Sequence, residues 1–455
     1  MKKLLALLLS AALVLSFAAC SQESSNSGSS KGESQAAEES SGGEDGSPVT
    51  VELMWCEITD DLDKAWQTLF EEFNKDYPNI TVKFNPTSNS SDTIRVQVAA
   101  GAGADMIQLD AFDVATYAKE GYLVDLSDVS SSNGWQDVLY DWAYKSCSYN
   151  DGLYALPWSY EMTCMQYNAK LLEEYGLEVP TTRAEFDAFC EKCKETGISP
   201  LSYGGLSSSP LYNQWIIDHY INSVAGSDLL VQVLKGEKAW DCAEMAGAMN
   251  VLVSDFEKGY YSNGLSASIT LDEGKSQFLS GQAFLYPEGT AFALNITDAE
   301  AENENFSLGL ALWPSMGDGL DCTGSYAAGE VIAINANSKN KEACKTVLEW
   351  MMTDDEAVCA AIAGGVSPPC RDVDYTLMPE NTLIGVSRAM EALNTFDDST
   401  NNSYAPWSFY PSTCNQYLYE NLDKIVLGTI TIEEYLATAQ SRFEDDVADG
   451  YVFAG

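Results

Sequence analysis

The chain is poor in the side chains on which many enzymes and nucleic-acid-binding proteins depend. It contains a single histidine, His219, and only 24 Lys and Arg residues against 68 Asp and Glu, which gives a net charge of −44. A Ser-His-Asp triad therefore has at most one candidate base, and a two-histidine metal site has at most one of its two histidine ligands. So acidic a surface also repels phosphate backbones, which argues against nucleic acid as a partner.

Several sequence signatures of catalysis and cofactor binding are also missing. The chain has no G-x-S-x-G, no Walker A loop, no G-x-G-x-x-G and no acidic calcium-binding loop. Cys190 and Cys193 form a C-x-x-C, but no second pair is present to complete a zinc site. Both cysteines share one helical face with Phe186 and Phe189, which favours core packing. We expect no metal and no cofactor.

Long apolar runs are confined to the N-terminus. Lys2 and Lys3 precede an apolar stretch, residues 4–17, which is followed by two alanines and Cys20. This pattern predicts a signal peptide over residues 1–19. The small residues before Cys20 resemble a bacterial lipobox, and that resemblance implies that Cys20 carries a lipid and begins the mature chain. The alternative is ordinary signal cleavage beside a chance cysteine.

The segment after Cys20 has the composition of a flexible tether. Residues 21–47 contain ten Ser, five Gly and no aromatic residue. Such a segment cannot bury enough apolar surface to offset its ordering entropy. Residues 48–455 then form a body long enough for two or more hydrophobic cores. The body has eleven scattered cysteines, and we interpret most of them as small buried side chains.

The beginning of the body alternates strands with helices. Period-2 segments predict strands over 49–54, 80–84 and 106–109, and helical spacing predicts helices over 62–73, 91–100 and 112–120. This rhythm predicts a mostly parallel sheet covered on both faces. Further along, Thr182 with Glu185 and Thr431 with Glu434 match the capping-box pattern at the starts of two helices. Other predicted elements are helices over 241–258 and 339–351 and a strand over 331–334.

A series of short motifs resembles one family over nearly the whole body. They occur in the family's order, at residues 103–109, 121–126, 152–157, 166–172, 179–186, 278–283 and 337–343. Together they resemble the extracellular solute-binding proteins of the maltose-binding type, which are the substrate-binding lipoproteins of ABC importers. Two positions depart from the family pattern: Ala104 replaces a proline and Arg183 replaces a tryptophan.

This resemblance implies an α/β fold of two lobes, each a mostly parallel sheet flanked by helices, with a ligand cleft at the hinge. We expect the first lobe to comprise residues 48–159 plus about 324–380, and the second 160–323 plus about 381–455. The implied protein is a monomer without enzymatic activity, held by its lipid alone on the extracellular face of the bacterial membrane. It would deliver its solute to ABC permease subunits that work with a separate ATPase.

Carbohydrate is the expected ligand, because the predicted loops after the strands combine aromatic rings with carboxylates. Rings stack on the apolar faces of sugars, and carboxylates accept hydrogen bonds from pairs of hydroxyls. The candidate ligand-binding residues are Trp55, Glu57, Asp110, Phe112, Trp158, Glu161, Tyr286, Glu288, Tyr326 and Trp407. Glu161 is placed there by the resemblance as well. Ala291 stands where maltose binders stack a tryptophan, which argues against maltose itself.

Two alternatives remain open. The same fold could bind a polyamine, a peptide or another small solute, since a polyamine site also uses aromatic residues and carboxylates. An extracellular glycoside hydrolase would need two carboxylates at a fixed separation, which Glu57, Glu161 and Glu288 could supply.

Overall fold

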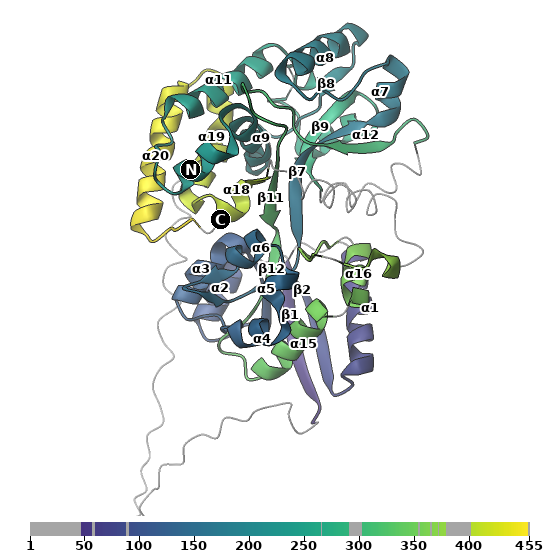
Figure 1. The fold of residues 1–455 in the computed structure, drawn as a ribbon, viewed down its shortest axis with the longest axis vertical. Coiled ribbons are helices and arrows are strands. Elements are labelled where there is room, and N and C mark those ends of the chain that lie inside the picture. Colours follow the sequence, from purple (N-terminus) through teal and green to yellow (C-terminus); the bar gives the residue numbers. More distant parts are fainter. Residues whose placement is uncertain are drawn as a thin grey trace, which may run out of the picture. The chain divides into compact units, whose positions relative to one another are not determined.

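The computed structural model describes residues 47–56, 60–87, 91–264, 266–290, 303–353, 355–364, 366–371, 373–378 and 402–453. Cys20, the predicted signal peptide, the predicted tether and Glu57 lie outside the described residues. The described part of the body has two large sheets with flanking helices (Figure 1), two hydrophobic cores and a small two-stranded sheet formed by Ser148–Tyr149 and Gly152–Leu153. This confirms the predicted two-lobed α/β fold.

The first sheet has the strand order β2-β1-β3-β12-β6. Its strands are β1 (Val49–Cys56), β2 (Ile80–Thr87), β3 (Met106–Asp110), β12 (Glu330–Ile334) and β6 (Leu156–Pro157). β1 is parallel to β2 and β3, as the alternating pattern predicts, whereas β12 is antiparallel to β3. The β3–β12 pairing joins segments more than 200 residues apart, so the first lobe is built from two separate parts of the chain.

Helices flank the first sheet, and the predicted helices over 62–73, 91–100, 112–120 and 339–351 are among them, whereas the helix Asp355–Ala363 was not predicted. They are α1 (Asp60–Asp76), α2 (Ser91–Ala99), η1 (Ala111–Asp113), α3 (Val114–Lys119), α15 (Lys341–Thr353) and α16 (Asp355–Ala363). The lobe also holds α4 (Ser127–Asn133), α5 (Trp135–Val138), α6 (Asp141–Ser146), β4 (Ser148–Tyr149) and β5 (Gly152–Leu153). The predicted face of α1 is buried, with Trp66, Leu69, Phe70 and Phe73 at 4% exposure or less.

The second sheet has the order β13-β11-β7-β9-β8, with β10 also paired to β7. Its strands are β7 (Tyr160–Asn168), β8 (Ser199–Leu201), β9 (Ala283–Gly289), β10 (Leu308–Ala311), β11 (Gly324–Ala328) and β13 (Asn402–Tyr404). β7 is antiparallel to β9, β10 and β11, whereas β8 is parallel to β9 and β13 is parallel to β11. Of the six described strands, five therefore run in one direction, as the predicted mostly parallel sheet requires, and β7 runs against them. The reason is that β7 leads out of the first lobe while β11 leads back to it, which forces the two strands to run in opposite directions.

The helices of the second lobe come from two stretches of chain. They are α7 (Ala169–Tyr175), α8 (Arg183–Thr196), η2 (Pro210–Tyr212), α9 (Asn213–Tyr220), η3 (Ile221–Ala225), α10 (Ser227–Leu234), α11 (Ala243–Glu257), η4 (Ser262–Gly264), α12 (Leu271–Leu279), α18 (Pro406–Phe409), α19 (Ser412–Val426) and α20 (Ile432–Ala448). The face of α8 that carries the C-x-x-C is buried, as predicted, with Phe186, Phe189, Cys190 and Cys193 in the core.

Two helix starts were predicted as capping boxes. The structure confirms the box at one of them and only the N-cap at the other. At α20, Thr431 accepts a hydrogen bond from the Glu434 backbone and the Glu434 side chain returns one, so the box is complete. At α8, Thr182 accepts from the Glu185 backbone, but Glu185 Oε2 accepts from the Thr181 backbone at 2.9 Å instead. The second prediction was therefore half right: Thr182 is the N-cap, but the reciprocal bond is shifted by one residue.

Ten of the cysteines in the described part of the chain are free, and eight of these ten are buried. This agrees with their interpretation as small core side chains. Within the described ranges, no helix combines the length and the apolar composition needed to cross a membrane.

The chain passes between the lobes at short, identifiable points. The first passage falls between β6 and β7, at residues 158–159, and the second between β11 and β12, at Gly329. The chain has returned to the second sheet by β13. The lobe boundaries predicted from the sequence stay a prediction, although β11 itself pairs within the second sheet. Figure 1 shows β7 and β11 side by side where the two lobes meet.

Candidate functional site

Two tryptophans of the second lobe face each other close to the strands that join the lobes. Trp215 lies in the first turn of α9, and Trp407 lies in α18, three residues after β13. Their ring centroids are 5.3 Å apart with the rings tilted by 44°, and Tyr212 stacks on Trp215 with a centroid distance of 4.7 Å. All three rings are half-buried rather than enclosed in the core. They form an aromatic surface that a flat apolar ligand face can contact.

A carboxylate of β7 lies beside this aromatic surface. A methyl group added to Gly289 would lie 2.5 Å from Glu161 Oε2 and 3.4 Å from Trp215 Nε1, so both side chains meet over this glycine. Glu161 is half-buried. The arrangement places an anionic acceptor next to an indole donor, which suits a ligand that carries both hydroxyl donors and acceptors.

A second aromatic group lies where β11 meets the first lobe. Trp142 of α6 stacks on Tyr326 of β11 at 6.0 Å and contacts Tyr160 of β7 at 5.7 Å. Tyr140 stacks on the far side of Trp142 at 6.2 Å. Tyr326, Tyr160 and Tyr140 are buried, whereas Trp142 is half-buried. Trp142 is therefore the ring of this group that a ligand can reach most readily.

The indole N–H groups of Trp142, Trp215 and Trp407 are buried and have no hydrogen-bond partner. Five fully buried tryptophans also leave this group unpaired, so the observation alone does not mark a site. What distinguishes these three is that their rings are half-exposed while the donor atom is shielded from solvent. An unsatisfied donor of this kind costs about 1–3 kcal/mol, which a ligand acceptor would recover.

Glu288 lies on β9, and its Cα pairs with that of Cys164 on β7. Burial raises the pKa of its carboxyl to about 7, although the Gly289 N–H, the Tyr286 hydroxyl and Lys275 act in the opposite direction. Near neutral pH this group is therefore partly protonated and can donate as well as accept a hydrogen bond. Of the three carboxylates that a glycoside hydrolase could use, Glu288 is therefore not fully ionised near neutral pH.

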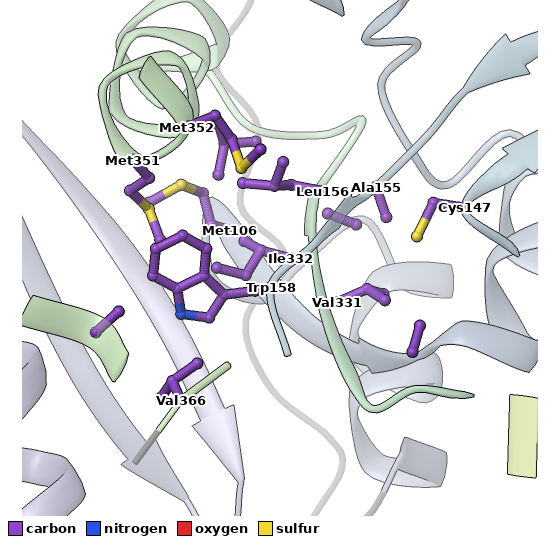
Figure 2. Packing of buried hydrophobic residues seen from close by; sticks show 14 of the residues in the cluster. Met106, Cys147, Ala155, Leu156, Trp158, Val331, Ile332, Met351, Met352 and Val366 are labelled. Atoms are coloured by element: carbon purple, nitrogen blue, oxygen red, sulfur yellow. The ribbon is translucent and has the colours of Figure 1, made fainter. Parts of the chain in front are cut away.

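Four predicted ligand residues belong to one hydrophobic core: Trp158, Trp55, Tyr286 and Tyr326. Trp158 is fully buried, and Figure 2 shows its ring between Met351 and Val366. Trp55 is 2% exposed and packs on Trp66 at 4.8 Å. Tyr286 is 1% exposed and stacks on Phe278 at 5.5 Å. Their role in binding stays a prediction, and in this structure their aromatic surfaces contact protein.

The remaining predicted residues lie at the end of β3. Asp110 is half-buried there, and Phe112 of η1 is 40% exposed. Phe112 lines a cavity of about 520 Å³ between η1, α3 and the segments α18–α20. None of the other predicted ligand residues lines this cavity. We therefore place the candidate site at Glu161, Trp215 and Trp407, where half-buried rings and a carboxylate meet.

Trp142 and Trp215 were not among the predicted site residues. Each lies within the first three residues of a short helix, so helical spacing assigns it to a packing face. The missed signal is position: side chains at the first turn of a helix can project past its end toward a neighbouring element. A search for aromatic residues at helix starts would have found both.

The free energy of unfolding should depend on pH, because two carboxyl groups have raised pKa values. Burial raises the pKa of Asp218 and Glu288 to about 7 and lowers that of His219 to about 3. A carboxyl whose pKa is raised by folding stabilises the fold below its unfolded pKa and loses this contribution as pH rises through 7. His219 opposes this only below its unfolded value of 6.5.

We therefore expect the free energy of unfolding to fall between pH 6.5 and pH 8. Urea denaturation at pH 6.5, 7 and 8 measures this slope. Glu288→Gln should make it shallower, because an amide does not titrate, while Asp218 keeps the remaining part of the slope. An identical slope in the variant would contradict the raised pKa of Glu288.

The sequence profile of bacterial extracellular solute-binding proteins matches residues 59–358. The chain belongs to this family. This confirms the resemblance that the motifs indicated and identifies the molecule as a solute-binding protein.

Curated relatives and solved structures agree with this assignment. A protein of Rhizobium meliloti named "Probable sugar-binding periplasmic protein" is 28% identical over 198 residues, 42% of this chain and 47% of the relative. The multiple sugar-binding protein of Streptococcus mutans is 21% identical over 313 residues, 64% of this chain and 69% of the relative. This chain spans about half the length of the first three curated relatives that it matches.

The solved structures show the fold of this solute-binding protein. A chitin oligosaccharide binding protein superposes with a TM-score of 0.73 at 20% identity, covering 88% of this chain and 99% of that one. The GacH receptor of Streptomyces glaucescens, studied with acarbose, has a TM-score of 0.70 at 20% identity over 88% of this chain and 99% of the receptor. At this level of identity the match establishes the two-lobed architecture.

Proposed function

We propose that this solute-binding protein captures a neutral oligosaccharide for an ABC importer. The observation that carries the proposal is the meeting of Trp215, Trp407 and Glu161 beside the strands that join the lobes. Half-buried rings offer stacking surfaces for pyranose faces, their indole N–H groups are unpaired donors, and Glu161 is an acceptor. This combination fits a polyhydroxylated ligand better than a purely cationic or purely apolar one.

The relatives support a sugar. The curated names include a multiple sugar-binding protein and a maltotriose-binding protein, and the solved structures include receptors for chitin oligosaccharides and raffinose. The charge of the chain supports a neutral ligand, because 68 acidic against 24 basic side chains would repel a phosphorylated or strongly anionic one.

The setting that we propose follows from the N-terminus. Lipidation at Cys20 and the Ser- and Gly-rich stretch 21–47 would tether a monomeric body to the outer face of the membrane. Because the chain has no ATP-binding loop, transport would require separate permease subunits and an ATPase. The protein would bind and release its ligand without chemical change.

A thermal-shift screen tests the proposed ligand class. A ligand that binds only the folded protein raises the melting temperature. At a ligand concentration of 100 times its Kd, the added free energy of unfolding is about 2.7 kcal/mol. We expect at least one neutral oligosaccharide of two to four units to raise the melting temperature in a saturable manner. Spermidine and a short peptide serve as the comparison. Stabilisation by either of these, with none from any sugar, would overturn the carbohydrate assignment and leave the family assignment intact.

A further inference from the structure

Beneath the proposed site lies a buried network of polar side chains that does not itself line the aromatic surface. Its members are Thr163 of β7, Asp218 of α9, Asn222 of η3, Ser325 of β11 and Ser403 of β13. Each is 3% exposed or less. Burying such a cluster is costly unless its polar groups form hydrogen bonds with one another.

The bonds run from one element to the next. Thr163 Oγ1 donates to Asp218 Oδ2 at 3.2 Å and accepts from the Ser325 backbone N–H at 3.2 Å. Asn222 Nδ2 donates to Asp218 Oδ1 at 2.7 Å and to Ser325 Oγ at 3.1 Å. The Ser403 hydroxyl donates to Asn222 Oδ1. The network therefore ties β7, β11 and β13 to the α9–η3 segment.

The position of these strands gives the network its significance. β7 begins at the first passage of the chain between the lobes, β11 ends at the second, and β13 begins the last part of the second sheet. The elements that the network joins also carry the proposed site. Trp215 lies one helical turn before Asp218, and Trp407 follows Ser403 by four residues, while Glu161 precedes Thr163 by two.

The backbone departs from regular α-helix at Asn222, whose side-chain amide belongs to the network. Residues Ile221–Ala225 form a π-helical turn directly after α9, and Asn222 lies within it. Single π-turns are rare and occur often at functional sites, since they redirect a side chain at the expense of regular helix bonding. Here the turn coincides with the Asn222 side chain that holds Asp218, Ser325 and Ser403 together.

We propose that the Thr163–Asp218–Asn222–Ser325–Ser403 network is a positioning device that fixes Trp215, Trp407 and Glu161 relative to the strands that join the lobes. Its members act through the site residues and touch no ligand. The inference rests on the proposed function only where it concerns affinity. The mechanical coupling of β7, β11, β13 and α9 can be measured without any ligand.

The test compares Thr163→Val with Thr163→Ser. Valine keeps the shape of threonine but cannot donate to Asp218, whereas serine retains the hydroxyl. Tyr435→Phe is the matched control, because it removes a single buried hydrogen bond, Tyr435 Oη to Leu418 O at 2.6 Å, between α19 and α20. Hydrogen exchange of the ligand-free protein is followed by mass spectrometry for all three variants.

We expect Thr163→Val to speed exchange in peptides covering β11, β13 and α9 as well as β7, and Thr163→Ser and Tyr435→Phe to leave these segments unchanged. Faster exchange confined to β7, or the same pattern in Tyr435→Phe, would overturn the proposal. If a sugar from the screen binds, Thr163→Val should bind it roughly tenfold more weakly, with affinity restored in Thr163→Ser. Failure of all sugars to bind would count against the proposed ligand, while the exchange pattern would still decide the network.

Discussion

Replacing Arg183 with Met is expected to destabilise the second lobe by about 3–5 kcal/mol, the cost of leaving a buried charge without its partner. Arg183 Nη1 donates to Asp255 Oδ2 at 2.7 Å, and Nη2 donates to Asp255 Oδ1 at 2.5 Å. The Asp255 side chain is fully buried. Arg183 Nη2 also donates to Asp187 Oδ1 at 2.7 Å, so one guanidinium joins α8 to α11.

Asp255 keeps other partners after the substitution, but they do not replace the two hydrogen bonds from the Arg183 guanidinium. Tyr220 donates to Asp255 Oδ2 at 2.8 Å, and Lys258 lies 3.7 Å from Oδ1. Urea denaturation measures the loss. Arg442→Met is the control, because Arg442 is 53% exposed and its ion pair with Asp445 is 4.0 Å long. Adding Asp255→Asn to Arg183→Met should recover part of the stability, since no buried charge remains. A loss below 1 kcal/mol for Arg183→Met would show that water reaches Asp255.

Replacing Trp407 with Ala is expected to weaken oligosaccharide binding by about 1–3 kcal/mol, which is roughly 5- to 150-fold in Kd. The Trp407 ring is half-buried, lies tilted against Trp215 with a centroid distance of 5.3 Å, and has an unpaired indole N–H. Trp215→Ala should have a similar effect. Because the two rings touch, the loss in the double variant should differ from the sum of the single losses.

Calorimetric titration with the sugar found by the screen measures these differences. Trp215→Phe and Trp407→Phe keep a ring but remove the N–H, so an intermediate loss would separate stacking from hydrogen bonding. Trp350→Phe is the control: its indole donates to Asp76 at 3.1 Å in the first lobe. Unchanged affinity in both alanine variants would move the site away from this pair.

Local patterns predicted the fold well because they depend on residues close in sequence. The spacing of Trp66, Leu69, Phe70 and Phe73 defines the buried face of α1 wherever the helix packs. The same reasoning identified the buried face of α8. It could not predict that β7 pairs antiparallel with β9, β10 and β11, because those partners lie more than 100 residues away and a strand's direction is set by where the chain crosses between lobes.

The candidate site was only partly predicted, because it too depends on contacts between residues far apart in sequence. Glu161 and Trp407 each lie beside Trp215 in the structure, although they are far apart in sequence, and their role in binding stays a prediction. Trp158 was chosen because it follows a predicted strand, but the passage from β6 to β7 runs through the core and buries the ring against Met351. Trp215 was missed because helical spacing does not distinguish a ring at the helix start from one on a packing face.

The network beneath the site could not be predicted from local pattern at all. Thr163, Asp218 and Ser403 are separated by tens to hundreds of residues, and each is an ordinary polar residue in its own segment. Only the fold brings them within hydrogen-bond distance.

Equilibrium dialysis of the purified protein tests the central claim most directly. The dialysate contains neutral oligosaccharides of two to four units, spermidine and a short peptide at equal concentrations, and the retained solutes are identified by mass spectrometry. We predict that one oligosaccharide accumulates to about one molecule per protein, in the manner of a single site enclosed between two lobes. Accumulation of spermidine or the peptide to that level, with no oligosaccharide retained, would contradict the claim.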